Sequence, residues 1–327
     1  MTFKEFINEW QNDEDFIEAK SSGSTGVPKI IHLKKDFVAE SARRTNEFFR
    51  INAKSVLHSC VSPDFIGGKM MAVRAIISNA RLSWEIPSNV PLLSPSDGVI
   101  DLLAVVPSQM ISIIERKDDL PHIRNIIVGG SRIHPALVKM IEKSSLNAYE
   151  TYGMTETASH IALRKISSEK RPFTLLPGIR IESDYDGCLK IFFENGYTVK
   201  TNDIVEIITE KEFYIKGRRD EIINTGGKKL NPNEIEDKIS GLLSCRYCVT
   251  GFPDMKWGEK VVLLLESPQA YDEETLKEKM KKILEPWQMP KEILRVEKLP
   301  LTPNGKIIRP KDPALLVYVS DDTSPSS

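Results

Sequence analysis

The sequence predicts an α/β fold: a large N-terminal α/β domain that includes a β subdomain, followed by a small, mobile α+β C-terminal domain. Three observations lead to this class. Apolar runs of strand length alternate with helix-like segments up to Arg164. Short strand-like segments separated by turn dipeptides follow that residue, and a charged segment at 217–220 then precedes a smaller unit.

In the first half, the spacing of apolar residues predicts a helix over 34–50 whose inner side carries Phe37, Val38, Ser41, Thr45, Phe48 and Phe49. The segments 99–106 and 123–128 are apolar runs of strand length. Two helices opened by Pro107 and Pro135 are expected over 109–116 and 135–143, because proline is tolerated in the first helical turn. Strands that are apolar throughout are buried on both faces, which indicates a mostly parallel sheet.

After Arg164 the predicted strands are short and joined by turns such as Asp186-Gly187 and Asn195-Gly196, which is typical of an antiparallel β subdomain. These strands are 178–182, 188–193, 197–201, 204–209 and 212–216. The last unit is expected to contain a helix over 233–243, strands over 248–252 and 260–266, and a helix over 273–284 capped by Asp272. We therefore predict an N-terminal domain over 1–216, a hinge at 217–220, a C-terminal domain over 221–313 and a disordered tail over 314–327.

Charge and composition exclude several classes of protein. The 45 basic and 46 acidic residues leave a net charge of −1, so no positive excess exists to bind nucleic acid. No apolar stretch approaches the roughly 20 residues that span a bilayer, and the N-terminus lacks the apolar core of a secretory signal. Four scattered cysteines, Cys60, Cys188, Cys245 and Cys248, suggest structural thiols in a reducing compartment, so we expect a cytoplasmic protein.

The segment Ser21-Ser22-Gly23-Ser24-Thr25-Gly26-Val27-Pro28-Lys29 has the chemistry of a polyphosphate-binding loop. Its glycines allow close backbone approach, its N–H groups and hydroxyls can donate to phosphate oxygens, and Lys29 adds a positive charge. The spacing differs from that of the Walker motif. Taken alone, the segment could also be a flexible linker.

Two further segments carry groups that suit a nucleotide. Tyr149-Glu150-Thr151-Tyr152-Gly153-Met154-Thr155-Glu156 offers an aromatic ring for a base, a hydroxyl for a phosphate and a carboxylate for Mg²⁺. Thr201-Asn202-Asp203 places a carboxylate where it could accept hydrogen bonds from ribose hydroxyls. The first could equally be an ordinary turn, and an aspartate in a turn usually caps backbone N–H groups.

The last two segments are a long glycine- and charge-rich stretch over 217–236 and the loop Pro300-Leu301-Thr302-Pro303-Asn304-Gly305-Lys306-Ile307-Ile308-Arg309. In this order, the five segments resemble those of the acyl-adenylating superfamily, which contains acyl-CoA synthetases, carrier-protein adenylation domains and luciferases. The resemblance extends from Ser21 to Arg309. It implies an AMP-forming acid–thiol ligase that uses ATP, Mg²⁺ and CoA.

The resemblance also implies roles for single residues. The phosphates of ATP would be held by Ser21, Ser22, Gly23, Ser24, Thr25, Gly26 and Lys29. Adenine and ribose would be bound by Gly129, Gly130, Ser131, Tyr152, Asp203 and Arg218. Thr155 would touch the α-phosphate, Glu156 would bind Mg²⁺, and Lys306 would serve the adenylation step. Asp220 matches the hinge of the family, and Gly226 and Gly227 match the loop beside its CoA tunnel.

The chain departs from the family pattern at three places. Relatives usually carry a long additional segment before the phosphate loop, so the first lobe of the large domain is expected to be truncated. Phe65 occupies the position of a histidine found in many relatives, so the role of that histidine cannot be carried over. Asn202 replaces the glycine of a Thr-Gly-Asp triplet, a mild change because asparagine tolerates positive φ.

Within the superfamily, the segment 65–75 resembles that of the short o-succinylbenzoate–CoA ligases of menaquinone synthesis. This substrate has two carboxylates, so the one that is not activated needs a cation or donors. We expect Phe65, Gly68, Lys69 and Arg74 to lie at the acyl pocket, although both cations could also be surface charges. Alternatives are a ligase for another aryl or short acyl acid, a ligase that loads a carrier protein, and a protein that binds ATP or an acyl-adenylate without turnover.

Overall fold

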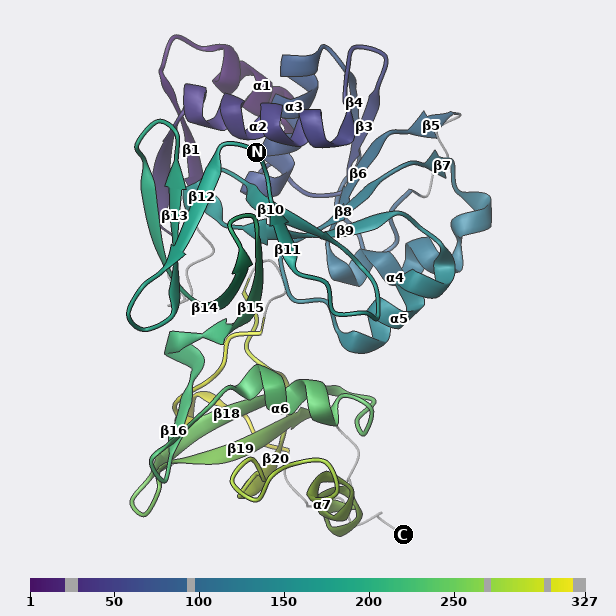
Figure 1. Ribbon diagram of the computed structural model, residues 1–327. Coiled ribbons are helices and arrows are strands. Elements are labelled where there is room, and N and C mark those ends of the chain that lie inside the picture. Colours follow the sequence, from purple (N-terminus) through teal and green to yellow (C-terminus); the bar gives the residue numbers. More distant parts are fainter. Residues whose placement is uncertain (21–28, 93–97, 268–271, 303–306, 320–327) are drawn as a thin grey trace. The chain divides into compact units, whose positions relative to one another are not determined.

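The computed structural model describes residues 1–20, 29–92, 98–267, 272–302 and 307–319 (Figure 1). Its contacts divide the chain into two compact units, which are described separately. Unit 1 comprises Met1–Glu182, Lys190–Lys200 and Ile207–Tyr214, and unit 2 comprises Ser183–Leu189, Thr201–Glu206 and Ile215–Ser327. None of the helices in the described part of the chain is long and apolar enough to cross a bilayer.

The largest sheet has 11 strands in the order β12-β13-β14-β15-β11-β10-β9-β8-β6-β3-β4. The last five of these pair in parallel and form the α/β part: β9 (Ala148–Gly153), β8 (Ile126–Val128), β6 (Leu102–Val105), β3 (Val56–Ser59) and β4 (Arg81–Trp84). The helices between them are α2 (Lys35–Phe49), α3 (Ile66–Ser78), α4 (Pro107–Glu115) and α5 (Pro135–Ser144). The mostly parallel α/β class predicted from the sequence is confirmed.

Both faces of the parallel strands are buried, and alternate residues face different helices. Leu103 and Val105 belong to the apolar cluster that contains side chains of α4 and α5. Leu102 and Ala104, which alternate with them along the strand, belong to the cluster that contains Met71 of α3. Figure 1 shows the two helix pairs on opposite sides of these strands. Full burial of such side chains contributes about 1.5–3 kcal/mol each, which explains the uninterrupted apolar runs.

The expectation of single strands over 99–106 and 123–128 was wrong in one respect, because polar residues divide each run. Asp101 separates β5 (Val99–Ile100) from β6, and Arg124-Asn125 separates β7 (His122–Ile123) from β8. The Asp101 carboxylate accepts hydrogen bonds from the Val56 N–H at 2.8 Å and from Arg124 Nη1 at 2.6 Å. These bonds satisfy a charged side chain at the amino ends of the strands. There the two apolar runs leave the large sheet, and β5 and β7 pair as a separate two-stranded sheet.

The β subdomain consists of β10 (His160–Lys165), β11 (Phe173–Leu175), β12 (Ile179–Ser183), β13 (Cys188–Phe193), β14 (Thr198–Thr209) and β15 (Glu212–Arg218). The predicted turn between strands 197–201 and 204–209 was wrong: β14 runs through Thr201-Asn202-Asp203 without a break. The neighbouring β-branched residues favour an extended chain more strongly than Asn202 and Asp203 oppose it. Asn202 has no positive φ, so the glycine of relatives is not required for the backbone here.

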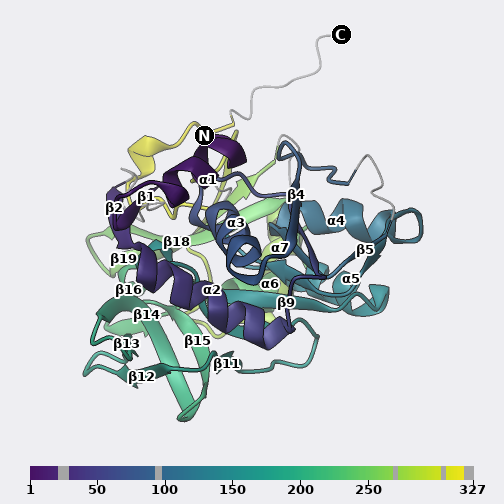
Figure 2. The same cartoon turned by 90° about the horizontal axis from the view of Figure 1, so that it is seen from above.

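The N-terminus forms a helix and a hairpin that the sequence reading did not predict. Helix α1 (Phe3–Gln11) begins with a capping box between Thr2 and Glu5 and buries Phe3 and Phe6. Figure 2 shows that α1 lies near α2 and α3, and that all three helices are on the same side of the parallel strands. The strands β1 (Phe16–Lys20) and β2 (Ile30–Lys34) pair antiparallel, with Lys20 opposite Ile30. The hairpin thus brings together the residues on either side of the predicted phosphate segment.

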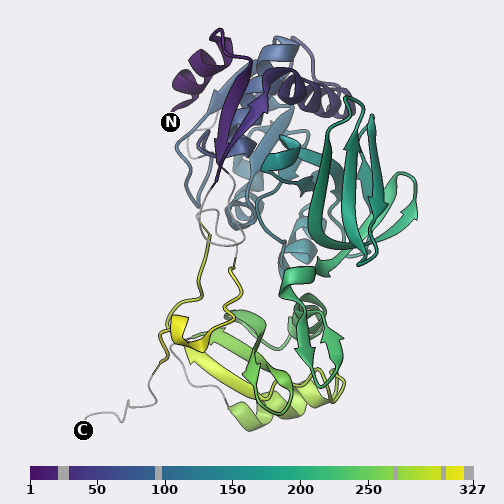
Figure 3. The same ribbon diagram turned by 90° about the vertical axis from the view of Figure 1, so that its left-hand side faces the viewer.

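The C-terminal part of unit 2 has its own sheet, built from β16 (Ile223–Thr225), β17 (Lys228–Leu230), β18 (Arg246–Asp254), β19 (Gly258–Glu266) and β20 (Glu292–Val296). Helices α6 (Pro232–Ile239) and α7 (Glu273–Lys281) contribute to the apolar cluster on one face. Leu299 and Leu316 of the C-terminal segment, yellow in Figure 3, belong to the cluster on the other face. Asp272 accepts from the Thr275 N–H, so its predicted capping role is confirmed. Both helices end earlier than predicted.

Candidate active site

The predicted phosphate segment is fixed at its base by the β1–β2 hairpin. Residues 21–28 lie outside the described part of the chain, while Lys29 lies inside it. The carbonyl oxygen of Lys20, immediately before the segment, accepts a hydrogen bond from Thr155 Oγ1 at 3.4 Å. Thr155 belongs to the second predicted nucleotide segment. The residue directly before the predicted phosphate segment is therefore in contact with the second motif, 135 positions later in the sequence.

A short 3₁₀ turn, Thr155–Thr157, presents the side chains of the second motif. The Thr157 hydroxyl accepts from the Met154 N–H at 3.0 Å and donates to the Ser159 carbonyl at 2.6 Å. Thr157 is 1% exposed, so these bonds lock the turn from its buried side. The turn holds Thr155 and Glu156 in fixed positions, which is what a site for a charged transition state requires.

Glu156 is the predicted magnesium ligand. Its side chain is half-buried, and no lysine or arginine of the described residues lies within 4.0 Å of its carboxylate. Burial and then the charge of Glu156 raise the pKa of Tyr197, so this phenol lies close enough to sense the carboxylate. A carboxylate that is not neutralised by a protein cation suits an ATP-bound Mg²⁺, which is commonly held through one or two carboxylates together with phosphate oxygens.

The predicted adenine-binding residues follow two neighbouring parallel strands. Gly129, Gly130 and Ser131 come directly after β8, and Tyr152 lies at the end of β9 beside it. The Thr151 hydroxyl donates to the Val128 carbonyl at 3.4 Å, which ties the two strand ends together. Carboxyl ends of parallel strands are the usual ligand-binding edge of an α/β sheet.

Tyr152 itself is more buried than a base-stacking ring would need to be. The residue is 8% exposed, and its ring lies 5.5 Å from that of Phe213 and 5.9 Å from that of Phe173. The structure thus gives Tyr152 a packing role in the β subdomain. Its contact with adenine stays a prediction.

In unit 2, the two predicted ribose-binding residues form an ion pair with each other. Arg218 Nη1 donates to Asp203 Oδ1 at 3.2 Å, and Arg218 also donates to both carboxylate oxygens of Asp220, at 3.0 and 2.9 Å. Although burial acts to lower the pKa of Arg218, its hydrogen bond to Asp220 and the nearby carboxylates raise it above its ordinary value. The predicted hinge residue Asp220 is therefore joined to the predicted ribose site through one guanidinium.

The predicted CoA-tunnel residues Gly226 and Gly227 form the two-residue turn between β16 and β17. Their φ values of 55° and 77° are the positive pair that a tight hairpin turn of this type demands. A side chain at Gly226 would also meet the indole of Trp257, because an added Cβ would lie 2.9 Å from its ring. Both glycines are exposed, which leaves their backbone accessible.

Lys306 lies outside the described residues, but the residues on both sides of its loop are fixed. The Ile308 N–H donates to the Pro300 carbonyl at 2.9 Å, and Leu301 and Ile307 form an antiparallel bridge. Arg309 follows three positions after Lys306. Its guanidinium donates to Glu221 Oε2 and to Glu236 Oε2, both at 2.9 Å, and to the Val249 carbonyl at 2.7 Å. Burial acts against this charge, yet the carboxylates raise the pKa of Arg309 well above its ordinary range.

At the predicted acyl-pocket segment, Phe65 precedes α3 as its N-cap residue and Gly68 lies in the first helical turn. A Cβ at Gly68 would lie 2.2 Å from the Ser62 carbonyl oxygen, so only glycine permits the chain to fold back this closely onto the helix. The segment 61–65 is thereby held against α3. Phe65 is half-buried.

The structure distinguishes Lys69 from Arg74, which the sequence alone leaves as equal candidates for binding a substrate carboxylate. Lys69 Nζ lies 3.1 Å from Glu9 Oε2 of α1 and 4.7 Å from the centre of the Phe6 ring. Its charge is therefore already matched within the protein. Arg74 is 1% exposed, and no carboxylate of the described residues lies within 4.0 Å of its guanidinium. Burial alone lowers the pKa of Arg74 to about 9, as expected for a cation that lacks an anionic partner.

Arg74 also leads into a buried polar chain that the sequence reading missed. Its Nη2 donates to Ser159 Oγ at 2.8 Å, while its Nε has no partner. His160 Nε2 lies 3.0 Å from Thr45 Oγ1, and the Thr45 hydroxyl donates to the Ser41 carbonyl at 3.3 Å. Burial and then the charge of Arg74 hold the pKa of His160 well below its usual range, so this imidazole is neutral. This group of buried polar side chains includes Ser159 and His160, which follow the Thr155–Thr157 turn in sequence.

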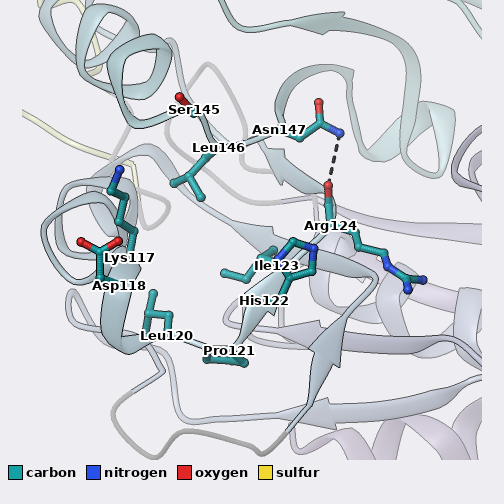
Figure 4. A pocket seen from close by; sticks show the side chains of 10 residues that line it. All are labelled: Lys117, Asp118, Leu120, Pro121, His122, Ile123, Arg124, Ser145, Leu146 and Asn147. Carbon is teal, nitrogen blue, oxygen red and sulfur yellow. Dashed lines mark hydrogen bonds between the residues drawn. The ribbon is translucent and has the colours of Figure 1, made fainter.

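The hollow drawn in Figure 4 lies elsewhere in unit 1. It is lined by residues that precede β8 and β9, among them His122, Arg124 and Asn147, whose side-chain amide donates to the Arg124 carbonyl at 3.2 Å. These are the amino ends of the parallel strands, opposite the edge that carries the motifs. None of the predicted site residues lines it.

The chain matches the family model of the AMP-binding enzymes over residues 21–182 and that of their C-terminal domain over residues 246–306. An acyl-CoA synthetase-like protein of known structure from Dyadobacter fermentans is 31% identical, with 93% of this chain and 90% of that one covered and a TM-score of 0.60. This chain belongs to the AMP-binding enzyme family. The resemblance to the acyl-adenylating superfamily is confirmed.

Several further similar proteins are CoA ligases or synthetases named for the same acid. A 2-succinylbenzoate–CoA ligase of Listeria monocytogenes is 27% identical over 94% of this chain and 71% of its own length. One from Lactococcus lactis is 30% identical over 65% of this chain and 51% of its own length. The o-succinylbenzoate CoA synthetase of Bacillus subtilis shares the fold, with a TM-score of 0.77 at 20% identity over 89% of this chain and 67% of that one.

Replacing Asp203 by alanine is expected to weaken ATP binding about 10- to 150-fold, since a charge-assisted hydrogen bond to ribose contributes about 1.5–3 kcal/mol. Calorimetric titration with ATP measures the effect. Asp186→Ala is the matched control, because Asp186 pairs with the neighbouring Arg219 at 2.8 Å and is exposed. Unchanged ATP affinity in Asp203→Ala would remove this carboxylate from the nucleotide site.

Proposed function

We propose that this protein is an AMP-forming acid–CoA ligase that activates 2-succinylbenzoate, the step that serves menaquinone biosynthesis. Its family, and the ligases to which it is similar over most of its length, support this reaction class. The contact between Thr155 and Lys20 is the observation that carries the proposal, because Lys20 directly precedes the predicted phosphate segment and here lies against the Thr155–Glu156 turn. A cytoplasmic location is part of the proposal, in keeping with four free cysteines.

The reaction follows from the chemistry of a carboxylate. Its charge is delocalised and its leaving group would be oxide, so it must first attack the α-phosphate of ATP, releasing pyrophosphate and forming an acyl-adenylate. Two anions approach each other in this step, so the protein must position them and neutralise their charge. Thr155 would contact the α-phosphate, Glu156 would hold the magnesium ion of the nucleotide, and Lys306 would supply a further positive charge.

In the second step the thiol of CoA attacks the carbonyl of the adenylate, and AMP leaves. Both steps use the same acyl carbon, so the group that served the first must give way to the path of the thiol. We propose that the C-terminal domain turns about Asp220, which removes Lys306 and brings in the Gly226–Gly227 turn. The exposed backbone of that turn supports this assignment.

For the acid, the buried guanidinium of Arg74 supports a dicarboxylate. A buried charge without an anionic partner is costly, and a ligand carboxylate would offset that cost. We therefore assign the second carboxylate of the substrate to Arg74 and not to Lys69, which is occupied by Glu9.

Pyrophosphate release measured with a panel of acids tests the proposal. We expect 2-succinylbenzoate to be preferred over benzoate, short acyl acids and fatty acids, and CoA to be preferred over a carrier protein as the thiol acceptor. Preference for another acid would contradict the assignment of 2-succinylbenzoate as the substrate, while the ligase class would still hold. Pyrophosphate release with none of the acids would favour a protein that only binds ATP or an adenylate.

Arg74→Met is expected to raise the KM for 2-succinylbenzoate about 10- to 150-fold, from the loss of charge-assisted hydrogen bonds of about 1.5–3 kcal/mol. Discrimination against an analogue without the ring carboxylate should fall by the same factor, and ATP affinity should not change. Lys69→Met is the control, since Lys69 comes from the same helix. Equal effects of the two variants on this discrimination would contradict the assignment to Arg74.

A further inference from the structure

A second group of reactive side chains lies at the carboxyl ends of β3 and β4. His58 and Cys60 are on either side of the last residue of β3, and Glu85 follows the last residue of β4. One nitrogen, one sulfur and one oxygen from these residues all lie within 4.8 Å of one another. The strands pair in parallel with His58 opposite Ser83, which explains why their ends bring the three groups together.

The imidazole of His58 is oriented for a ligand. Its Nδ1 lies 2.8 Å from Ser83 Oγ, and the Ser83 hydroxyl donates to the Leu57 carbonyl at 3.3 Å. Because the hydroxyl has one proton, it accepts from Nδ1–H, and the lone pair of His58 is left on Nε2. The side chain is 9% exposed, and its Nε2 is a buried polar atom without a hydrogen-bond partner.

The other two residues, Cys60 and Glu85, offer a sulfur donor and an oxygen donor beside that lone pair. Glu85 Oε2 lies 3.8 Å from His58 Nε2, and no lysine or arginine in the described ranges lies within 4.0 Å of this carboxylate. Cys60 is 1% exposed and free. Around tetrahedral zinc, nitrogen, oxygen and sulfur donors stand about 3.3–3.6 Å apart, so side-chain rotation must shorten the widest of these distances by about 1 Å.

We propose that His58 Nε2, Cys60 Sγ and a Glu85 oxygen bind one zinc ion, with water as the fourth ligand. The thiol proton of Cys60 leaves to solvent on binding, since zinc takes the thiolate. Ser83 acts as the outer partner that fixes the His58 tautomer, and the Leu92 N–H, 3.0 Å from both Glu85 oxygens, orients the carboxylate. The ion would link the carboxyl ends of β3 and β4, and so stabilise the point from which the segment 61–68 leads to α3. This inference is independent of the proposed ligase activity.

Cobalt and zinc binding to the metal-stripped full-length protein test the site. We expect one equivalent of Co²⁺ to give a sulfur-to-cobalt charge-transfer band in the near ultraviolet, and Zn²⁺ to displace it and raise the Tm. Cys60→Ala should abolish the band and weaken zinc binding at least 100-fold in competition with a chromophoric chelator. Ser83→Ala should weaken it about 10- to 100-fold. Cys188→Ala, which removes another buried thiol, should change neither result.

No charge-transfer band in the wild-type protein, or a band that persists in Cys60→Ala, would overturn the site. If Cys60→Ala does not fold, a variant that carries Cys188→Ala, Cys245→Ala and Cys248→Ala together decides the question. Cys60 is then the only thiol of the chain. The band is kept in that variant if the inference holds and is lost if another cysteine binds the metal.

Discussion

Lys306→Ala is expected to slow adenylate formation about 10²- to 10³-fold, the usual effect of removing one group that stabilises developing charge. Thioester formation from supplied acyl-adenylate and CoA should stay within a few-fold of the wild-type rate. The reason is that the proposed mechanism uses this ammonium only while the carboxylate attacks ATP. The two half-reactions are measured separately, by pyrophosphate release and by thioester formation.

Lys311→Ala is the matched control for this prediction. Lys311 lies on the same segment, is 40% exposed and pairs with Glu259 at 3.4 Å. It should retain both half-reactions, which would exclude a general effect of losing a lysine near the C-terminus. Equal losses in the two half-reactions of Lys306→Ala would show that the lysine is not specific to adenylation.

Arg309→Met should destabilise the C-terminal part of unit 2 by about 3–5 kcal/mol, because it removes a largely buried cation from two partly buried carboxylates, of which Glu221 also has a second cation, Arg218, within 4.0 Å. Glu221 and Glu236 both receive hydrogen bonds from this guanidinium, and their side chains are 18% and 14% exposed. Hydrogen exchange of β18 and α6 measures the effect locally, which is preferable to one global unfolding curve for a chain with two units.

Arg246→Met provides the comparison on the same sheet. Arg246 is 49% exposed and lies 3.3 Å from Glu266, so its loss should change stability by less than about 1 kcal/mol. A similar small effect of Arg309→Met would mean that the carboxylates find other partners. Because Arg309 follows the Lys306 loop, the variant should also lower adenylation more than thioester formation.

The parts of the fold that could be predicted are those in which one short-range pattern decides the outcome. Apolar runs such as 102–105 can be buried only between two layers, so they revealed the parallel sheet. Asn202-Asp203 indicated a turn because these residues favour turns locally, but pairing within an antiparallel sheet overrode that preference in β14. Helix α1 was missed, although its capping box of Thr2 and Glu5 is visible in the sequence.

At the candidate site, the sequence could supply residue types but not their partners. Lys69 and Arg74 are equivalent as cations in a sequence, and only the position of Glu9, 60 residues earlier, distinguishes them. The group of His58, Cys60 and Glu85 has no motif, because its members come from two strands whose spacing in sequence is set by α3.

The Lys20–Ile30 pairing has a consequence for engineering the nucleotide loop. The nine residues from Ser21 to Lys29 lie between Lys20 and Ile30, which pair with each other in the β1–β2 ladder. The ladder therefore keeps these two flanking residues together, whatever the length of the segment between them. Doubling the length of a flexible loop adds only about 0.6 kcal/mol of closure entropy. A fluorescent or affinity tag inserted there should therefore leave the fold intact while silencing nucleotide binding, which would provide a catalytically dead but natively folded reference protein.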